Sequence, residues 1–103
     1  MDNPLDFSGK VVLVTGGGKG VGRGISECFL SAGADVVICG RSAPESLPRS
    51  GEREAVLTEC DVREYAQIEA CVDFAVKQFG RLDVLVNNAG GAPYADAATA
   101  SPR

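Results

Sequence analysis

The spacing of apolar residues along the chain predicts alternating strands and helices. Four short and largely apolar runs lie at residues 11–14, 34–39, 55–60 and 82–86. Such runs, rich in valine and leucine, are typical of strands buried on both faces of a parallel sheet. The segments after the first and third runs carry apolar residues at helical spacing instead. The pattern therefore predicts a doubly wound α/β fold.

Each predicted helix has one apolar face, which we expect to pack against the sheet. Gly33 ends the first helix and Gly80 ends the second. Asp61, three residues before Glu64, forms a variant capping box at the start of the second helix. The expected faces are Val21, Ile25, Cys28, Phe29 and Ala32 in the first helix, and Ile68, Cys71, Val72, Ala75, Val76 and Phe79 in the second.

Residues 41–54 do not continue this pattern. The segment is rich in proline, serine, glycine and charged residues, and its two prolines oppose a helix. We predict a surface loop with at most one helical turn.

Composition limits the kind of protein further. The 103 residues suffice for one domain, and 45% of them are hydrophobic, as in soluble globular proteins. No apolar run approaches the roughly 20 residues of a membrane helix. The net charge is −4 without a basic cluster, which argues against nucleic-acid and membrane partners. The first residues do not resemble a signal peptide, so we expect a cytoplasmic protein.

The inventory of reactive side chains is small. The chain contains no histidine, which excludes histidine-based acid–base catalysis and most metal sites. The cysteines at 28, 39, 60 and 71 form no Cys-x-x-Cys pair, so we expect buried reduced thiols and no metal site.

The densest chemical signal follows the first predicted strand. Glycines occur at 16, 17, 18, 20 and 22, between the first apolar run and the helix predicted after it. Such glycines allow positive φ and a close approach of the backbone to a ligand. The N–H groups and positive dipole end of the helix that begins there favour an anion. A strand, a glycine turn and a helix together predict a phosphate cradle.

The glycine spacing narrows the type of cradle. Neither the Gly-x-Gly-x-x-Gly dinucleotide fingerprint nor the phosphate-binding P-loop pattern fits. The sequence from Thr15 reads Thr-Gly-x-x-x-Gly-x-Gly, with glycines at 16, 20 and 22. This pattern resembles the cofactor loop of the short-chain dehydrogenase/reductase family, which binds NAD or NADP on a Rossmann sheet. The alternative is a tight turn that binds nothing.

A second motif, Asn87-Asn88-Ala89-Gly90, follows the fourth predicted strand. The resembling family has Asn-Asn-Ala-Gly at this place, beside the cofactor ribose and bracing the sheet. The resemblance covers about residues 8–93, implies the strand order 3-2-1-4 with two flanking helices, and gives Thr15 the role of bracing the loop against the asparagines. An Asn/Gly turn without function is the alternative for this motif.

The end of the second strand should distinguish NAD from NADP. Asp35 lies at the start of that strand, roughly 16 Å from Gly40 at 3.3 Å per residue, so it is at the wrong end for the ribose 2′-hydroxyl. Gly40 occupies the position of the acid in NAD-dependent members, and Arg41 and Ser42 follow it. Lys19 and Arg41 suit a 2′-phosphate, so we expect NADP, with NAD less favoured. Alternatively, both are solvated surface charges.

Asp61 and Val62 match an Asp-Val pair that contacts adenine in the family, a role compatible with the helix cap described above. The full set of expected cofactor-binding residues is Gly16, Gly18, Lys19, Gly20, Val21, Gly22, Arg41, Ser42, Asp61, Val62, Asn88, Ala89 and Gly90.

The chain lacks the residues that carry the family's chemistry. Neither Tyr65 nor Tyr94 has a lysine four residues later, and we assign no catalytic residue. The resemblance therefore implies that residues 1–103 form one NAD(P)-binding domain, the N-terminal part of an oxidoreductase that acts on a small-molecule substrate. Hydride transfer would involve a carbonyl and an alcohol, or an activated C=C bond. Family analogy implies a homo-oligomer. The alternative is a non-catalytic dinucleotide-binding or regulatory fragment.

Overall fold

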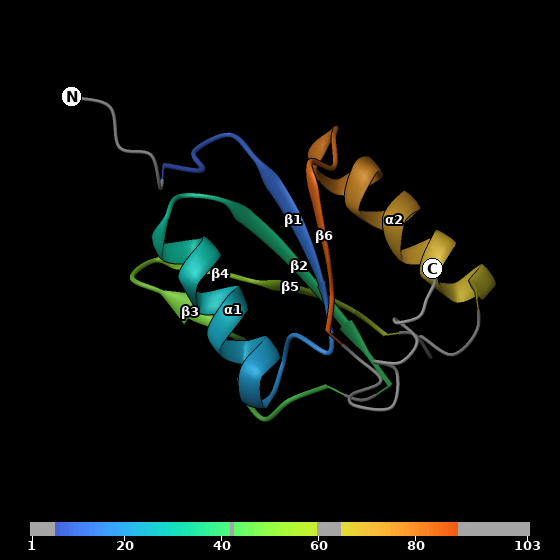
Figure 1. The fold of residues 1–103 in the computed structure, drawn as a ribbon, viewed down its shortest axis with the longest axis horizontal. Helices are drawn as coiled ribbons and strands as arrows, with labels where there is room; N and C mark the ends of the chain where they lie inside the picture. The colour runs from blue at the N-terminus through green and yellow to red at the C-terminus, as the bar shows by residue number, and fades with distance from the viewer. Residues whose placement is uncertain (1–5, 42, 60–64, 89–103) are drawn as a thin grey trace.

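The computed structural model describes residues 6–41, 43–59 and 65–88. Within these ranges, strands and helices alternate along most of the chain, as Figure 1 shows. The elements are β1 (Val11–Thr15), α1 (Gly20–Ser31), β2 (Asp35–Gly40), β3 (Arg49–Ser50), β4 (Arg53–Glu54), β5 (Val56–Glu59), α2 (Tyr65–Phe79) and β6 (Val84–Asn87).

Four of the strands form a parallel sheet in the order β5-β2-β1-β6. This confirms the predicted order 3-2-1-4, since the hairpin strands β3 and β4 belong to a separate small sheet. Thr15 pairs in register with Cys39 of β2 on one side and with Asn87 of β6 on the other. The carboxyl ends of the three strands therefore meet at one edge of the sheet.

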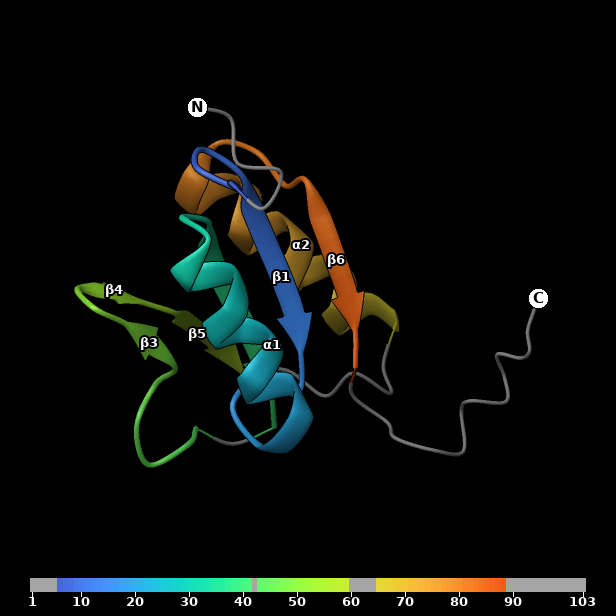
Figure 2. The ribbon, with the colours of Figure 1, turned by 60° about the vertical axis from the view of Figure 1, so that its left-hand side comes forward.

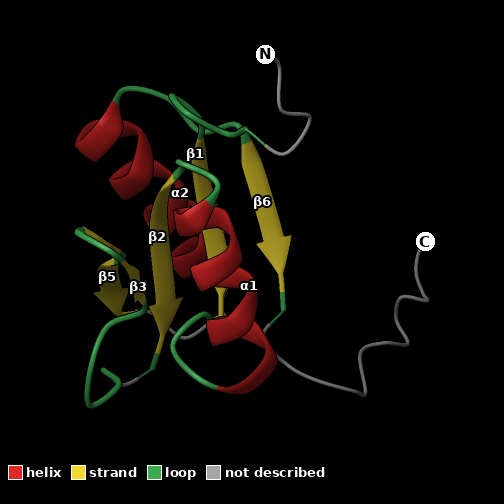
Figure 3. Ribbon diagram, turned by 90° about the vertical axis from the view of Figure 1, so that its left-hand side faces the viewer, coloured by secondary structure: helices red, strands yellow, loops and turns green. Residues whose placement is uncertain are grey.

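The two helices cover opposite faces of the sheet, as predicted. Figure 3 shows α1 in front of the strands and α2 behind them. Because neighbouring strand residues point to opposite faces, the core consists of two layers. Val12, Val14, Val36 and Ile38 pack with Leu30 on the α1 side. On the α2 side the packed residues are Leu13, Val37, Cys39, Cys71 and Ala75.

The face of α1 that meets the sheet agrees with the predicted one only in part, since Ile25 and Phe29 are half-buried and pack against the α1-side core. Gly22, Ser26 and Leu30 are buried at intervals of four residues, whereas Val21 is 75% exposed and Cys28 is exposed. Small side chains allow the start of the helix to approach the strands closely. The larger apolar residues consequently lie on the flank of the helix, so the expectation that all the cysteines are buried was also wrong for Cys28.

The flank of α1 holds the segment that precedes β1. The rings of Phe7 and Phe29 meet edge to face with their centroids 5.2 Å apart. The Phe7 amide donates a 2.8 Å hydrogen bond to the carbonyl oxygen of Ala32. Gly33 follows with a φ of +100°, which confirms that it ends the helix.

Helix α2 follows its predicted pattern more closely. Cys71 and Ala75 are buried, but Val76 is 41% exposed, so that part of the expected face was wrong. Gly80, with a φ of +87°, donates to the Val76 carbonyl oxygen and ends the helix as predicted. The cap expected at Asp61 and Glu64 lies outside the described residues. Within the described ranges, neither helix is long and apolar enough to span a membrane.

The segment predicted as a loop contains a β-hairpin and not a helical turn. Arg49 pairs with Glu54 and Ser50 with Arg53 in antiparallel register, and Gly51 has a φ of +61° in the turn. An ion pair of 3.7 Å joins the side chains of Arg49 and Glu54. Figure 2 shows this hairpin beside α1. Two short strands paired across a glycine turn therefore occupy residues 49–54 of this segment.

A carboxylate joins the beginnings of β1 and β6. The Asp83 side chain accepts a 2.8 Å hydrogen bond from the Val11 amide, and its own amide donates to the Val11 carbonyl oxygen at 2.9 Å. The Arg81 guanidinium donates to both carboxylate oxygens, at 2.8 and 2.9 Å. Hydrogen bonds from Arg81 and then from Val11 hold the pKa of Asp83 below its ordinary value.

We expect this carboxylate to make the fold sensitive to acid. A carboxyl whose folded pKa is lowered stabilises the fold above its unfolded pKa of about 3.9, and the contribution is lost as the pH falls through the folded value. Asp83→Asn should therefore lower the free energy of unfolding at pH 6, and this deficit relative to wild type should shrink as the pH falls below about 3.9. Urea unfolding at several pH values measures the difference.

Asp73→Asn is the matched control, because Asp73 is an exposed carboxylate on α2. Its unfolding free energy should follow the wild type from pH 6 to pH 3. An Asp83→Asn deficit of constant size over that range would contradict the role given to the carboxylate.

Candidate functional site

The loop between β1 and α1 has the backbone shape that its glycines predict. Gly16 has a φ of +67° and Gly20 a φ of +55°, both in the left-handed region that side chains disfavour. A Cβ at Gly20 would meet no atom within 4 Å. The turn therefore requires glycine for its backbone conformation, and it is open to a ligand at Gly20.

The inner side of the same loop is tightly packed. A Cβ at Gly22 would collide with the carbonyl oxygen of Gly16 and lie 2.5 Å from Nδ2 of Asn88. A Cβ at Gly17 would lie 2.5 Å from the Ile38 side chain. These glycines bring the start of α1 against the ends of β1, β2 and β6.

The N-terminus of α1 opens from this loop. Lys19 is the N-cap residue and its side chain makes no capping hydrogen bond. No acidic residue lies in the first turn of the helix. The first amides of a helix have no partner within it, and they lie at the positive end of its dipole. This helix end can therefore bind an anion such as a phosphate.

Hydrogen bonds brace the loop against the end of β6, as the resemblance implied for Thr15. The Asn88 amide donates to the Thr15 hydroxyl oxygen at 2.8 Å, and that hydroxyl lies 3.2 Å from Oδ1 of Asn87. The Asn88 side chain donates to the Gly16 carbonyl oxygen at 3.4 Å. Thr15 is 1% exposed, so these bonds are shielded from water.

A cavity of about 220 Å³ lies between the glycine loop and the end of β2. Lys19 and Arg41, which the sequence analysis placed near one another, both line it. A Cβ at Gly40 would meet no atom within 4 Å, so the strand end is open here. The full lining is Gly16, Gly18, Lys19, Ile38, Cys39, Gly40, Arg41, Pro44 and Leu57.

Asp35 lies at the other end of β2, as predicted. It pairs in register with Val11 at the start of β1, and its carboxylate lies 3.4 Å from the Arg53 guanidinium. The carboxylate is therefore remote from the cavity and is paired within the chain.

The remaining predicted residues divide into two groups. Gly18 lines the cavity, where a Cβ would lie 3.1 Å from the Pro44 ring, and Val21 lies exposed on the flank of α1. The others lie outside the described residues: Ser42, Asp61, Val62, Ala89 and Gly90.

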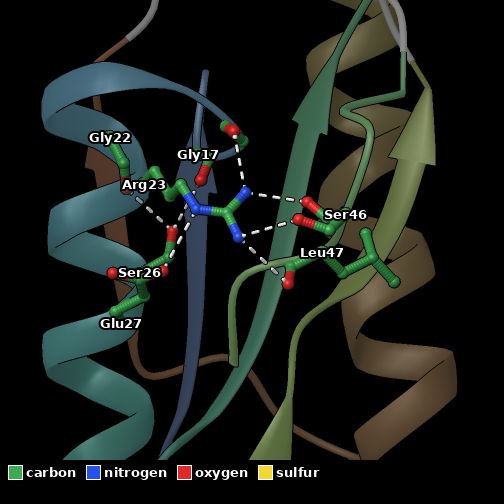
Figure 4. Close-up of polar contacts among 8 residues, drawn as sticks. Gly17, Gly22, Arg23, Ser26, Glu27, Ser46 and Leu47 are labelled. Atoms are coloured by element: carbon green, nitrogen blue, oxygen red, sulfur yellow. Dashed lines mark hydrogen bonds and ion pairs between the residues drawn. The ribbon is translucent and has the colours of Figure 1, made fainter. Parts of the chain in front are cut away.

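Sequence reasoning missed Arg23, which connects α1 to the segment after β2 (Figure 4). Its guanidinium donates to the carbonyl oxygens of Ser46 at 2.7 Å and Leu47 at 3.4 Å, and to the Ser46 hydroxyl at 3.2 Å. It also reaches the Gly18 carbonyl oxygen at 3.4 Å and the Glu27 carboxylate at 3.1 Å. A cation near the positive end of a helix is unfavourable. The position of Arg23 near the start of the predicted helix was therefore the one signal that its side chain has partners elsewhere in the chain.

Ser26 was missed for a different reason. Its buried hydroxyl lies 3.1 Å from the Gly17 carbonyl oxygen and 2.9 Å from that of Gly22, so one donor faces a carbonyl of the loop and a carbonyl of the first turn of α1. A serine in an amphipathic helix is expected on the solvent-exposed face. Only the close approach of α1 to the sheet places it inside.

Comparison with known proteins agrees with this geometry. A family model described as short chain dehydrogenase matches residues 10–102. The chain belongs to the short-chain dehydrogenase family. Its loop, parallel sheet and strand order are therefore those of an NAD(P)-dependent oxidoreductase family.

Individual relatives match only part of their own length. L-fucose dehydrogenase of Bos taurus is 46% identical over 90 residues, which cover 84% of this chain and 33% of the relative. Peroxisomal 2,4-dienoyl-CoA reductase of Pongo abelii is 41% identical over 88 residues, which cover 80% of this chain and 30% of the relative. The solved structure of hydroxysteroid dehydrogenase from Escherichia coli matches with a TM-score of 0.69 at 30% identity. The match covers 84% of this chain and 39% of the solved chain. The chain thus spans about a third of these proteins.

The tight packing around Gly22 leads to a prediction of stability. Gly22→Ala should lower the free energy of unfolding by about 1–3 kcal/mol, because its methyl group must displace the backbone at Gly16 or the side chain of Asn88. Urea unfolding monitored by circular dichroism measures this loss.

Gly24→Ala is the matched control in the same helix. A Cβ there meets no atom within 4 Å, so alanine should stabilise the helix by about 0.5–1 kcal/mol. If both substitutions change stability equally, the loop is not held by the contact between Gly22 and Gly16.

Proposed function

We propose that this chain is the NADP(H)-binding part of an oxidoreductase. The observation that carries the proposal is the meeting of Lys19 and Arg41 in one cavity beside the N-terminus of α1. The helix end offers amides for a pyrophosphate, and the two cations offer charge-assisted hydrogen bonds for a 2′-phosphate. Arginine is well suited to the phosphate because its planar guanidinium can donate two parallel hydrogen bonds.

The carboxylate that would favour NAD is absent from this position. Gly40 stands at the end of β2, and Asp35 is paired with Arg53 at the opposite end of the strand. A ribose 2′-hydroxyl would find no carboxylate from either residue in the cavity. This distribution of charge favours NADP over NAD.

The other predicted residues complete the proposed site. Gly16, Gly18, Gly20, Val21 and Gly22 would lie along the pyrophosphate, and Asn88 with Ala89 and Gly90 beside the ribose. Ser42 would accompany Arg41 at the 2′-phosphate. Asp61 and Val62 would contact adenine.

In the whole protein, the cofactor would accept or supply a hydride, while this part of the chain binds and orients it. The substrate would be a small molecule that carries a carbonyl, an alcohol or an activated C=C bond. The relatives support both reaction types, since one is named L-fucose dehydrogenase and another 2,4-dienoyl-CoA reductase. The homo-oligomer and the cytoplasmic location stay predictions.

A non-catalytic dinucleotide-binding fragment is the second candidate. The absence from these 103 residues of a tyrosine followed four residues later by lysine favours it for the chain taken alone. The two candidates share the binding site and differ in whether further residues supply a proton donor.

We expect cofactor preference to follow the charges at the end of β2. In wild type, NADP+ should bind more tightly than NAD+, because each cation on the 2′-phosphate contributes roughly tenfold after solvent screening. In the double variant Gly40→Asp, Arg41→Leu, the dissociation constant of NAD+ divided by that of NADP+ should be about tenfold lower than in wild type, or lower still. Isothermal titration of both nucleotides measures this ratio.

Arg49→Leu is the control for loss of a cation, because Arg49 is exposed in the hairpin and pairs with Glu54. Its ratio should equal that of wild type. A wild-type preference for NAD+, or a double variant with the wild-type ratio, would show that Lys19 and Arg41 are surface charges.

The 103-residue chain should show no turnover by itself. A proton donor with its tuning lysine is not found in this sequence, so NADPH and a panel of ketones should react at the rate seen with a Gly20→Asp, Gly22→Asp variant, whose added charges repel phosphate. Loss of NADPH absorbance at 340 nm follows the reaction. Turnover clearly above the variant would place a proton donor within these residues.

A further inference from the structure

The hydrogen bonds of Arg23 join three segments of the chain around the candidate cavity. We call these contacts the Arg23 network: the Arg23 guanidinium with the Gly18 carbonyl, Glu27, the carbonyl and hydroxyl of Ser46, and the Leu47 carbonyl. Arg23 and Glu27 belong to α1, Gly18 to the glycine loop, and Ser46 and Leu47 to the segment after β2. In Figure 4 the guanidinium lies between the helix and that segment.

The segment held by the network forms one wall of the cavity. Pro44 lines the cavity and packs against Gly18, where even a methyl group would lie 3.1 Å from the proline ring. Arg41, three residues earlier in the chain, lines the same cavity. The position of this wall relative to the glycine loop therefore determines how far Arg41 lies from Lys19.

Side-chain packing secures the far end of the segment but leaves its middle to hydrogen bonds. Pro48 is buried and Leu47 packs against the α1-side core, whereas Glu45 and Ser46 are exposed. The shortest bond of the network, 2.7 Å, is donated to the Ser46 carbonyl oxygen. The network thus acts where the segment lacks packing.

We propose that Arg23 is a positioning residue that holds residues 44–47 against the glycine loop and thereby sets the selectivity for a 2′-phosphate. This inference rests on the proposed NADP(H) function. Arg23 need not touch the cofactor, because its guanidinium is engaged with Glu27 and with backbone carbonyls. It acts through Pro44 and Arg41.

The geometry requires arginine and not only a positive charge. Nε contacts Glu27, Nη1 contacts Gly18 and Ser46, and Nη2 contacts Ser46 and Leu47. These acceptors lie on two sides of a planar fork, which a single ammonium group cannot span. Lysine at this position would keep the charge and lose the connection.

The test compares Arg23→Lys with the matched control Arg49→Lys, which makes the same change in an exposed hairpin arginine. Adenosine 2′,5′-bisphosphate and 5′-AMP are the probes, titrated calorimetrically into the 103-residue chain. Arg23→Lys should reduce the preference for the bisphosphate by about tenfold, and Arg49→Lys should leave it unchanged. Glu27→Gln, which keeps the size of the side chain and removes the charge that orients Arg23, should give a smaller loss in the same direction.

Amide hydrogen exchange of residues 43–48 supplies a second readout that needs no nucleotide. Exchange should be faster in Arg23→Lys than in wild type and unchanged in Arg49→Lys. A lower melting temperature with wild-type selectivity would show a purely structural role and overturn the proposal, as would wild-type exchange in this segment. If wild type binds neither probe, the proposed function fails and the selectivity role with it, while faster exchange in Arg23→Lys still supports the positioning role.

Discussion

The close approach of α1 to the carboxyl ends of β1, β2 and β6 is the constraint on which the rest of this structure depends. It is possible because Gly22 presents no side chain to the Gly16 carbonyl, and Gly17 presents none to Ile38. Thr15 and Asn88 then fasten the loop to β6 by hydrogen bonds that are largely shielded from water. A phosphate site made of backbone amides needs this rigidity, because the amides can stabilise an anion only if they are oriented before it binds.

The same close approach explains the unusual inner face of the helix. A large apolar residue at position 22 or 26 would push α1 away from the sheet, so small residues are buried there and Leu30 provides the packing further along. The buried hydroxyl of Ser26 is satisfied by the backbone carbonyls of Gly17 and Gly22. The larger apolar residues lie on the flank of the helix, where Phe7 and Phe29 pack. The close approach of the glycine loop and α1 to the sheet thus determines which residues of this helix are buried.

Much of the fold could be predicted from apolar runs and glycines, because strands buried on both faces and helix ends leave local signals. The four parallel strands, both helices and the glycines that end them were found in this way, whereas the strand order followed from the family resemblance. The face of α1 was wrong at Val21 and Cys28, because amphipathic spacing assumes that the largest apolar residues meet the core. The hairpin at residues 49–54 was missed, since two-residue strands carry almost no periodic signal. Arg23 was missed because three of its acceptors are the backbone carbonyls of Gly18, Ser46 and Leu47, and any residue supplies a carbonyl.

The sequence by itself determined the chemistry available to this protein: a glycine turn before a helix, two cations at 19 and 41 with glycine and not an acid at position 40, and no histidine. These properties depend on residue types and short spacings. Only the tertiary structure decided which distant residues meet, because parallel pairing brings the ends of β1, β2 and β6 to one edge whatever their separation in the chain. It placed Lys19 with Arg41 in one cavity, paired Asp35 with Arg53 away from it, and linked Arg23 to residues 46 and 47.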